Sequence, residues 1–101
     1  MGVKIETKDC TVPAYLAGEI EHHCAPAIRG EIDLAVESGR PENLVLDFGE
    51  VTFMDSSGIG LVMGRYRLMK DMGGRVSVEN TPVHIKKVMR LAGLDRIANI
   101  T

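Results

Sequence analysis

Residues 47–60 read Asp47-Phe48-Gly49-Glu50-Val51-Thr52-Phe53-Met54-Asp55-Ser56-Ser57-Gly58-Ile59-Gly60. They follow the apolar run Leu44-Val45-Leu46, which is typical of a strand covered on both faces in a parallel sheet. The strand leads into a short polar loop around Ser56 and then into the helical pattern of residues 57–72. A strand, a short loop and a helix form the repeating unit of α/β proteins. The stretch therefore predicts the α/β class.

The same unit recurs along the rest of the chain. We predict an N-terminal hairpin followed by alternating helices and strands. The strands are expected at residues 3–8, 11–17, 44–46, 76–78 and 96–100, and the helices at 26–38, 57–72 and 81–92. The order β-β-α-β-α-β-α-β requires right-handed crossovers and a mostly parallel sheet, with the first strand added antiparallel at one edge. No linker interrupts this pattern, so we predict one domain over residues 1–101.

Single residues refine these boundaries. Pro13 lies within the second strand and predicts an edge position or a bulge, because proline has no N–H to donate to a ladder. Gly18 is expected to close that strand, and Gly39 is a signal for the end of the first helix. Thr81 and Pro82 predict a helix that begins with a side-chain cap and a first-turn proline.

The composition limits the classes of function. The chain has 101 residues, of which 45% are hydrophobic and 4% aromatic, with no Trp. These values indicate one small domain with an aliphatic core, which leaves little room for both a large substrate cleft and a cofactor domain. Two cysteines cannot make a disulfide scaffold. We therefore expect neither an enzyme nor a bound cofactor.

Charge is unevenly distributed along the chain. Residues 1–50 carry ten acidic and four basic side chains, a net charge of −6, whereas residues 51–101 carry four and eight, a net charge of +4. Such polarity favours the orientation of a protein partner. The pI of about 5.9 and the lack of a basic run argue against nucleic-acid binding. Neither a secretory signal nor a membrane-spanning apolar segment is present in the sequence, so we expect a cytoplasmic protein.

Ser56 stands where the second helix begins. Asp55, Ser56 and Ser57 can each serve as the N-cap, which stabilises a helix by about 0.5–2 kcal/mol. Three candidates for one capping role leave room for a second role. The exposed N–H groups and the positive dipole end of a helix N-terminus tolerate a phosphate charge of about −1.5 to −2, although Asp55 opposes it. Ser56 is therefore a candidate phosphorylation site.

Other interpretations of this stretch are weaker. The glycines of Gly58-x-Gly60-x-x-x-Gly64 depart by one residue from the dinucleotide-binding pattern, and no Walker sequence follows them. A hydrolase nucleophile elbow needs glycine where Met54 stands. Gly60 and Gly64 each cost a helix about 1 kcal/mol relative to alanine. Because close approach usually offsets such a cost, we expect tight packing on the sheet, with a partner groove as the alternative.

Residues 18–24, Gly-Glu-Ile-Glu-His-His-Cys, join the second strand to the first helix. Their position at the carboxyl end of a strand predicts that they lie beside Ser56. Adjacent histidines near Cys24 hint at a metal ion, but neighbouring side chains point apart on a helix or a strand, and only His84 remains elsewhere. We therefore predict a surface loop and no metal site.

Two separate motifs resemble those of a known family. Residues 53–60 are similar to the phosphorylation motif of the anti-sigma factor antagonists of the STAS-domain family, and residues 18–23 resemble the second signature loop of that family. Residues 64–66 and 73–74 also fit. The resemblance extends over residues 1–100 and is strongest to the antagonists of the sporulation sigma-F switch. It implies a single STAS domain built of a sheet and helices.

The resemblance also implies partners. The unphosphorylated protein would bind an anti-sigma factor that is itself a serine kinase using ATP, and would thereby free the sigma factor. Phosphorylation of Ser56 would abolish binding, and a metal-dependent serine phosphatase would restore it. By the same resemblance, Glu21, Asp55, Ser57 and Gly58 would line the docking face. The family usually has Asp at the position of Glu21, and its members commonly carry a further C-terminal helix.

Two other functions remain open from the sequence. One is a STAS-like regulatory or ligand-sensing subunit of another bacterial complex, in stress signalling or lipid transport. The other is a serine hydrolase, which needs a histidine within about 3 Å of Ser56. His22 and His23 are the candidates for that base, but no acyl-transfer motif accompanies them.

Overall fold

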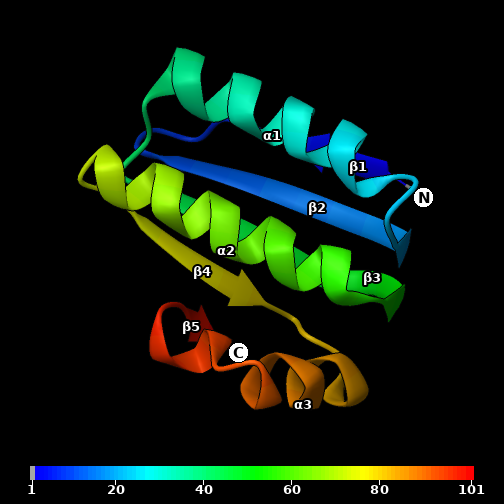
Figure 1. The fold of residues 1–101 in the computed structure, drawn as a ribbon. Coiled ribbons are helices and arrows are strands. Elements are labelled where there is room, and N and C mark those ends of the chain that lie inside the picture. Colours follow the sequence, from blue (N-terminus) through cyan, green and yellow to red (C-terminus); the bar gives the residue numbers. More distant parts are fainter. Residues whose placement is uncertain (1) are drawn as a thin grey trace.

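The computed structural model describes residues 2–101. Within this part of the chain, five strands form one sheet in the order β1-β2-β3-β4-β5 (Figure 1). The strands are β1 (Gly2–Ile5), β2 (Thr11–Ile20), β3 (Asn43–Met54), β4 (Arg75–Glu79) and β5 (Asn99–Ile100). β1 pairs with β2 in antiparallel orientation, and every other neighbouring pair is parallel. The predicted mixed sheet with an antiparallel N-terminal edge strand is confirmed.

The helices of residues 2–101 connect the parallel strands. They are α1 (Ala25–Gly39), α2 (Ser56–Asp71) and α3 (Val83–Leu91), followed by a short 3₁₀-helix, η1 (Leu94–Arg96). α1 and α2 lie side by side over one face of the sheet (Figure 1). The predicted order is confirmed, with η1 as an addition that the sequence did not predict. None of these described helices is long and apolar enough to cross a membrane.

The core lies between the sheet and the helices α1 and α2. Leu44, Leu46 and Phe48 of β3 are fully buried there, in the alternating phase of a strand with one inner face. Val45 points the other way and is only half-buried. The prediction that this strand is covered equally on both faces is therefore wrong, because α1 and α2 pack on the same side.

β2 is longer and more central than its sequence indicated. It continues through Gly18, and Pro13 lies opposite Val45 in an interior strand without a register shift at that point. The expected edge position or bulge at Pro13 is therefore wrong. The carbonyl of Pro13 accepts the N–H of Glu6 at 3.0 Å, just beyond the end of β1. The missing N–H is tolerated because Pro13 faces the end of β1, where only one hydrogen bond is lost, while the pairing of β2 with β3 continues past it.

The pairing of β2 with β3 contains two irregularities, between Tyr15 and Ala17 and between Gly18 and Glu19. At each of them β3 contributes one extra residue, so that 12 residues of β3 pair with 10 of β2. An extra residue breaks the alternation of a strand. As a result, residues 49–50 and 52–53 of β3 form two exposed pairs.

The end of α1 and the start of α3 differ from expectation. α1 includes Gly39, and the left-handed residue that ends it is Arg40, with a φ of 45°. α3 begins after Pro82, whose ψ of 146° is extended, and has no side-chain cap. Thr81 is therefore too far from the first turn to cap it, and its hydroxyl is buried without a partner.

Arg65 of α2 is buried against α1, with 6% of its surface exposed. Its Nε lies 2.9 Å from Oδ1 of Asp33 on α1. These two atoms are not aligned for a hydrogen bond and Arg65 Nη1 has no partner, so the contact is mainly an attraction between charges. Burial lowers the pKa of Arg65, and the charge of Asp33 opposes that shift. The ion pair ties the two helices together.

Removal of Asp33 should leave Arg65 buried without a counter-charge. We expect Asp33→Ala to lower the free energy of unfolding by about 3 kcal/mol, at the low end for broken buried pairs because Asp33 is partly exposed. The double variant Asp33→Leu/Arg65→Met should regain most of that loss, because no charge stays buried. Urea unfolding measures both changes, and a double variant as unstable as the single one would contradict the prediction.

Candidate functional site

Two loops meet at the carboxyl end of the sheet. Ile20, the last residue of β2, pairs with Met54, the last residue of β3. One step further, the N–H of Asp55 donates to the carbonyl of Ile20 at 3.1 Å. The loop of residues 21–24 and the start of α2 therefore lie side by side, which confirms the expectation that the two motifs are neighbours.

Asp55 is the N-cap of α2. Its Oδ1 accepts the N–H of Ser57 at 2.8 Å, and its carbonyl accepts the N–H of Gly58 at 3.0 Å. The hydrogen bond from the Ser57 backbone is the main cause that lowers the pKa of Asp55, with a further contribution from His22. Of the three candidates for the cap, the structure thus selects Asp55.

Ser56 is the first residue of α2 and is exposed. Across residues 2–101, no hydrogen bond involves its hydroxyl, because Asp55 provides the cap. Ser57, by contrast, is only partly exposed. The Ser56 side chain therefore stands free beside the N–H groups of the first turn.

Gly58 is buried beneath these residues. A Cβ at this position would lie 2.6 Å from Sδ of Met54 and would overlap its Cγ. The next nearest atom to this Cβ would be Cγ2 of Ile20, at 3.5 Å. Gly58 thus lets the first turn of α2 settle directly on the ends of β2 and β3, and it contributes to the site through packing.

Glu21, His22 and His23 lie in a turn rather than in a helix or a strand. Oε2 of Glu21 is 3.2 Å from Nδ1 of His23 and 3.6 Å from Nδ1 of His22. The argument that neighbouring side chains point apart is therefore wrong here, because a turn lets both rings face one carboxylate. Nδ1 of His22 also lies 3.8 Å from Oδ2 of Asp55, which links this turn to the start of α2.

The pKa of Glu21 is lowered although partial desolvation acts to raise it. Hydrogen bonding from the His23 backbone and the charge of His23 outweigh desolvation. The turn itself is fixed by its backbone, since the carbonyl of Glu21 accepts the N–H groups of Cys24 and Ala25 at 3.1 and 2.9 Å. The buried thiol of Cys24 donates to the carbonyl of Glu19 at 3.0 Å. The sequence analysis assigned Cys24 no role.

Phe53 is an exposed aromatic side chain close to Ser56 in the sequence, and no role was expected for it. It lies three residues before Ser56 and is 50% exposed, in a chain with few aromatic residues. The second irregularity of the β2–β3 pairing turns Thr52 and Phe53 outward together. Strict alternation along β3 could not have predicted this, because the extra residue shifts the phase.

The hydrolase interpretation lacks the geometry that it needs. Nδ1 of both His22 and His23 faces carboxylates. In the described chain, neither ring is hydrogen-bonded to the hydroxyl of Ser56. Among residues 2–101, the exposed hydroxyl of Ser56 thus has no histidine hydrogen-bonded to it, and the histidines of the neighbouring turn contact carboxylates instead.

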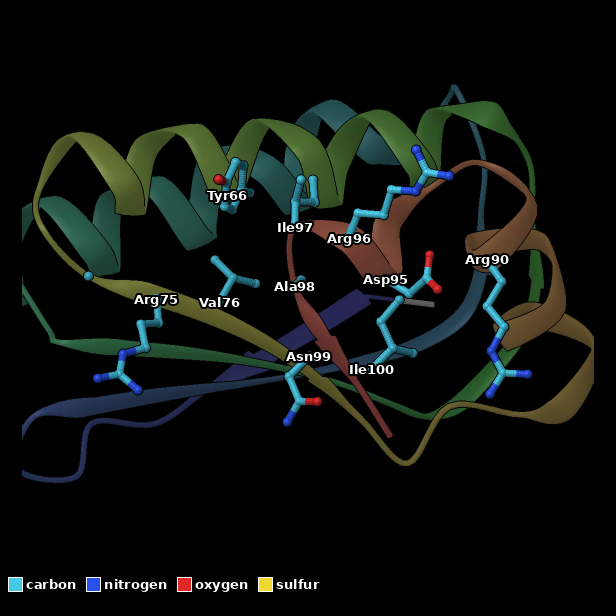
Figure 2. Close-up of a pocket in the computed structure, with 11 residues that line it drawn as sticks. Tyr66, Arg75, Val76, Arg90, Asp95, Arg96, Ile97, Ala98, Asn99 and Ile100 are labelled. Carbon is cyan, nitrogen blue, oxygen red and sulfur yellow. The ribbon is translucent and has the colours of Figure 1, made fainter.

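An open hollow of about 410 Å³ adjoins the site and is lined by Gly18, Glu19, Glu21 and Thr52. Another, of about 540 Å³, lies beside β5 and shares no residue with the site (Figure 2). The side chains of Arg75, Arg90 and Arg96 around it point in different directions, so they do not converge on one ligand (Figure 2). The hollow in Figure 2 therefore does not add to the candidate site.

Comparison with known proteins shows the family of this chain. A family model described as the STAS domain matches residues 3–101. The chain belongs to the STAS-domain family. This STAS domain is 38% identical over 87 residues to an anti-sigma F factor antagonist of Paenibacillus polymyxa, covering 84% of the chain and 73% of that protein. It is 27% identical over 101 residues to an anti-sigma-B factor antagonist of Bacillus subtilis, covering 100% of the chain and 91% of that protein.

Solved structures give the same picture. The unphosphorylated form of the anti-sigma factor antagonist SpoIIAA is similar to the STAS domain with a TM-score of 0.85 and 33% identity, covering 98% of this chain and 87% of that one. The phosphorylated form of SpoIIAA, a Bacillus cell fate determinant, gives a TM-score of 0.77 at 33% identity, covering 98% and 90%. The STAS domain thus resembles a protein whose structure is known in both states.

Packing at Gly58 predicts opposite effects for two similar substitutions in α2. Gly58→Ala should lower the free energy of unfolding by about 1–3 kcal/mol, because its Cβ meets Met54. Gly60→Ala is the matched control and should raise it by up to about 1 kcal/mol, because nothing lies within 4 Å of the added Cβ. Urea unfolding measures the free energy of unfolding of both variants. Changes of the same sign would show that Gly58 has no special packing role.

Proposed function

We propose that this STAS domain is an anti-sigma factor antagonist of the cytoplasm, switched by phosphorylation of Ser56. In its unphosphorylated form it binds an anti-sigma factor that is also a serine kinase, and so releases the sigma factor. One observation carries the proposal: Asp55 caps α2, which leaves the exposed Ser56 hydroxyl free to be modified without loss of the cap. The likeness to anti-sigma factor antagonists, including both forms of SpoIIAA, supports it.

The docking face of this proposal consists of Glu21, Asp55, Ser57 and Gly58 around Ser56. Glu21 and Asp55 supply carboxylates, and Ser57 is partly exposed in the first turn of α2. Gly58 is buried, so its part is to seat the first turn of α2 on Met54.

A phosphate on Ser56 changes this face through charge. It adds about −1.5 to −2 beside Asp55, which compares with a net charge of −2 for the whole chain. The N–H groups at the start of α2 stabilise an anion locally, so the fold remains intact. The phosphate also adds bulk where the partner approaches, and desolvation of a dianion opposes docking. A metal-dependent serine phosphatase completes the cycle by removing the phosphate.

Phosphate mapping tests the proposal directly. With the candidate kinase and ATP, mass spectrometry should find one phosphate, on Ser56, because its hydroxyl is exposed and free of hydrogen bonds. Ser56→Ala should abolish the modification, and Ser57→Ala should retain it as the matched neighbour. Phosphate on any residue other than Ser56 would sink the proposed mechanism.

The affinity for the kinase should distinguish the effect of a negative charge at position 56 from the effect of losing the Ser56 hydroxyl. Ser56→Ala should bind with close to wild-type affinity and should resist release by ATP, because it cannot be phosphorylated. Ser56→Asp should bind at least about tenfold more weakly, a loss of roughly 1.4 kcal/mol, because the added carboxylate must be desolvated at the docking face. Calorimetry measures both affinities. Equal affinities of the Ala and Asp variants would show that charge at this position does not control docking.

A further inference from the structure

The turn after β2 gathers three metal-ligating side chains that the proposed function does not require as a group. One ligand atom from each of Glu21, His22 and His23 lies within 4.8 Å of the others. Both histidine rings present Nδ1 to the same oxygen, Oε2 of Glu21. His22 and His23 are 71% and 73% exposed at their side chains, so an ion can reach them from solvent without any opening of the fold.

The spacing of these atoms suits a tetrahedral ion. Zinc lies about 2.0–2.1 Å from imidazole nitrogen and about 2.0–2.2 Å from carboxylate oxygen, so neighbouring ligand atoms around it are roughly 3.3 Å apart. Nδ1 of His23 and of His22 lie 3.2 and 3.6 Å from Oε2 of Glu21. Small rotations of exposed side chains are enough to close the difference.

The backbone holds the three residues in place before any ion arrives. The carbonyl of Glu21 accepts two N–H groups from the start of α1, and the Cys24 thiol donates to the carbonyl of Glu19. Oδ2 of Asp55 lies 3.8 Å from Nδ1 of His22, while Oδ1 is occupied by the helix cap. Asp55 is not one of the three residues whose ligand atoms all lie within 4.8 Å of one another, so it steadies His22 and leaves the fourth position to water.

We propose that Glu21, His22 and His23 bind one divalent transition-metal ion of the zinc type, with water in the fourth position. Two imidazoles and a carboxylate suit Zn²⁺, whereas Mg²⁺ prefers oxygen ligands alone. The ion lies beside the residue that precedes Ser56. The site does not depend on the proposed function, since the isolated domain suffices to form it.

Zinc titration of the purified domain tests the site. Zn²⁺ is added in competition with a chromogenic zinc indicator, in a Cys10→Ser background that removes the exposed thiol, and with Mg²⁺ in excess. We expect one equivalent to bind, with His22→Gln and His23→Gln each weakening the affinity at least about tenfold. His84→Gln is the matched control and should bind like the parent. Absence of competition, or unchanged affinity in the His22 and His23 variants, would overturn the site.

A second measurement asks whether the ion acts on docking, and this part rests on the proposed function. Because Glu21 belongs to both surfaces, one equivalent of Zn²⁺ should weaken kinase binding about tenfold in the Cys10→Ser domain. In the His22→Gln variant, the affinity with and without Zn²⁺ should be equal. Equal weakening in both proteins would place the effect on the kinase and refute the coupling. Zinc binding without any phosphorylation of Ser56 would instead refute the proposed function and leave the metal site standing.

Discussion

The parallel pairing of β2 with β3 is the constraint on which the site depends. The two strands differ in length, with 10 and 12 residues, yet they end level at Ile20 and Met54. Two extra residues in β3 absorb the difference. The hydrogen bond from Asp55 to Ile20 then extends the ladder into the loops. Without this match, the turn that holds Glu21 and the start of α2 would lie at different levels of the sheet.

Because the two strands end level, the residues at the start of α2 have different structural roles. Asp55 is fixed to β2 through its N–H and to α2 through its carboxylate, so it sets the direction of the helix. Gly58 lets the first turn lie against Met54. Ser56 lies between these two residues, is exposed, and makes no side-chain hydrogen bond to any of residues 2–101. A side chain held by a rigid backbone but free of structural duties is well suited to reversible modification.

The sequence predicted those features that follow from hydrophobic periodicity. The alternation of helices and strands, the antiparallel first strand and the adjacency of the two loops all follow from apolar patterns such as Leu44-Val45-Leu46. The errors arose where pairing or a turn overrides local chemistry. Pro13 is tolerated in an interior strand because β1 ends beside it, and His22 and His23 converge because they lie in a turn. Phe53 is exposed because of a register shift, which no single-strand pattern reveals.

Gly60 and Gly64 of α2 differ from Gly58 because neither is required by packing within the domain. A Cβ at Gly60 or Gly64 would meet nothing within 4 Å, so the close approach expected from the sequence is not made by any residue in the described part of the chain. Each glycine nevertheless costs the helix about 1 kcal/mol relative to alanine. Ser56, Gly60 and Gly64 are spaced four residues apart and therefore share one face of α2. At these three positions the face carries no large side chain, and no contact within residues 2–101 offsets the cost of the two glycines.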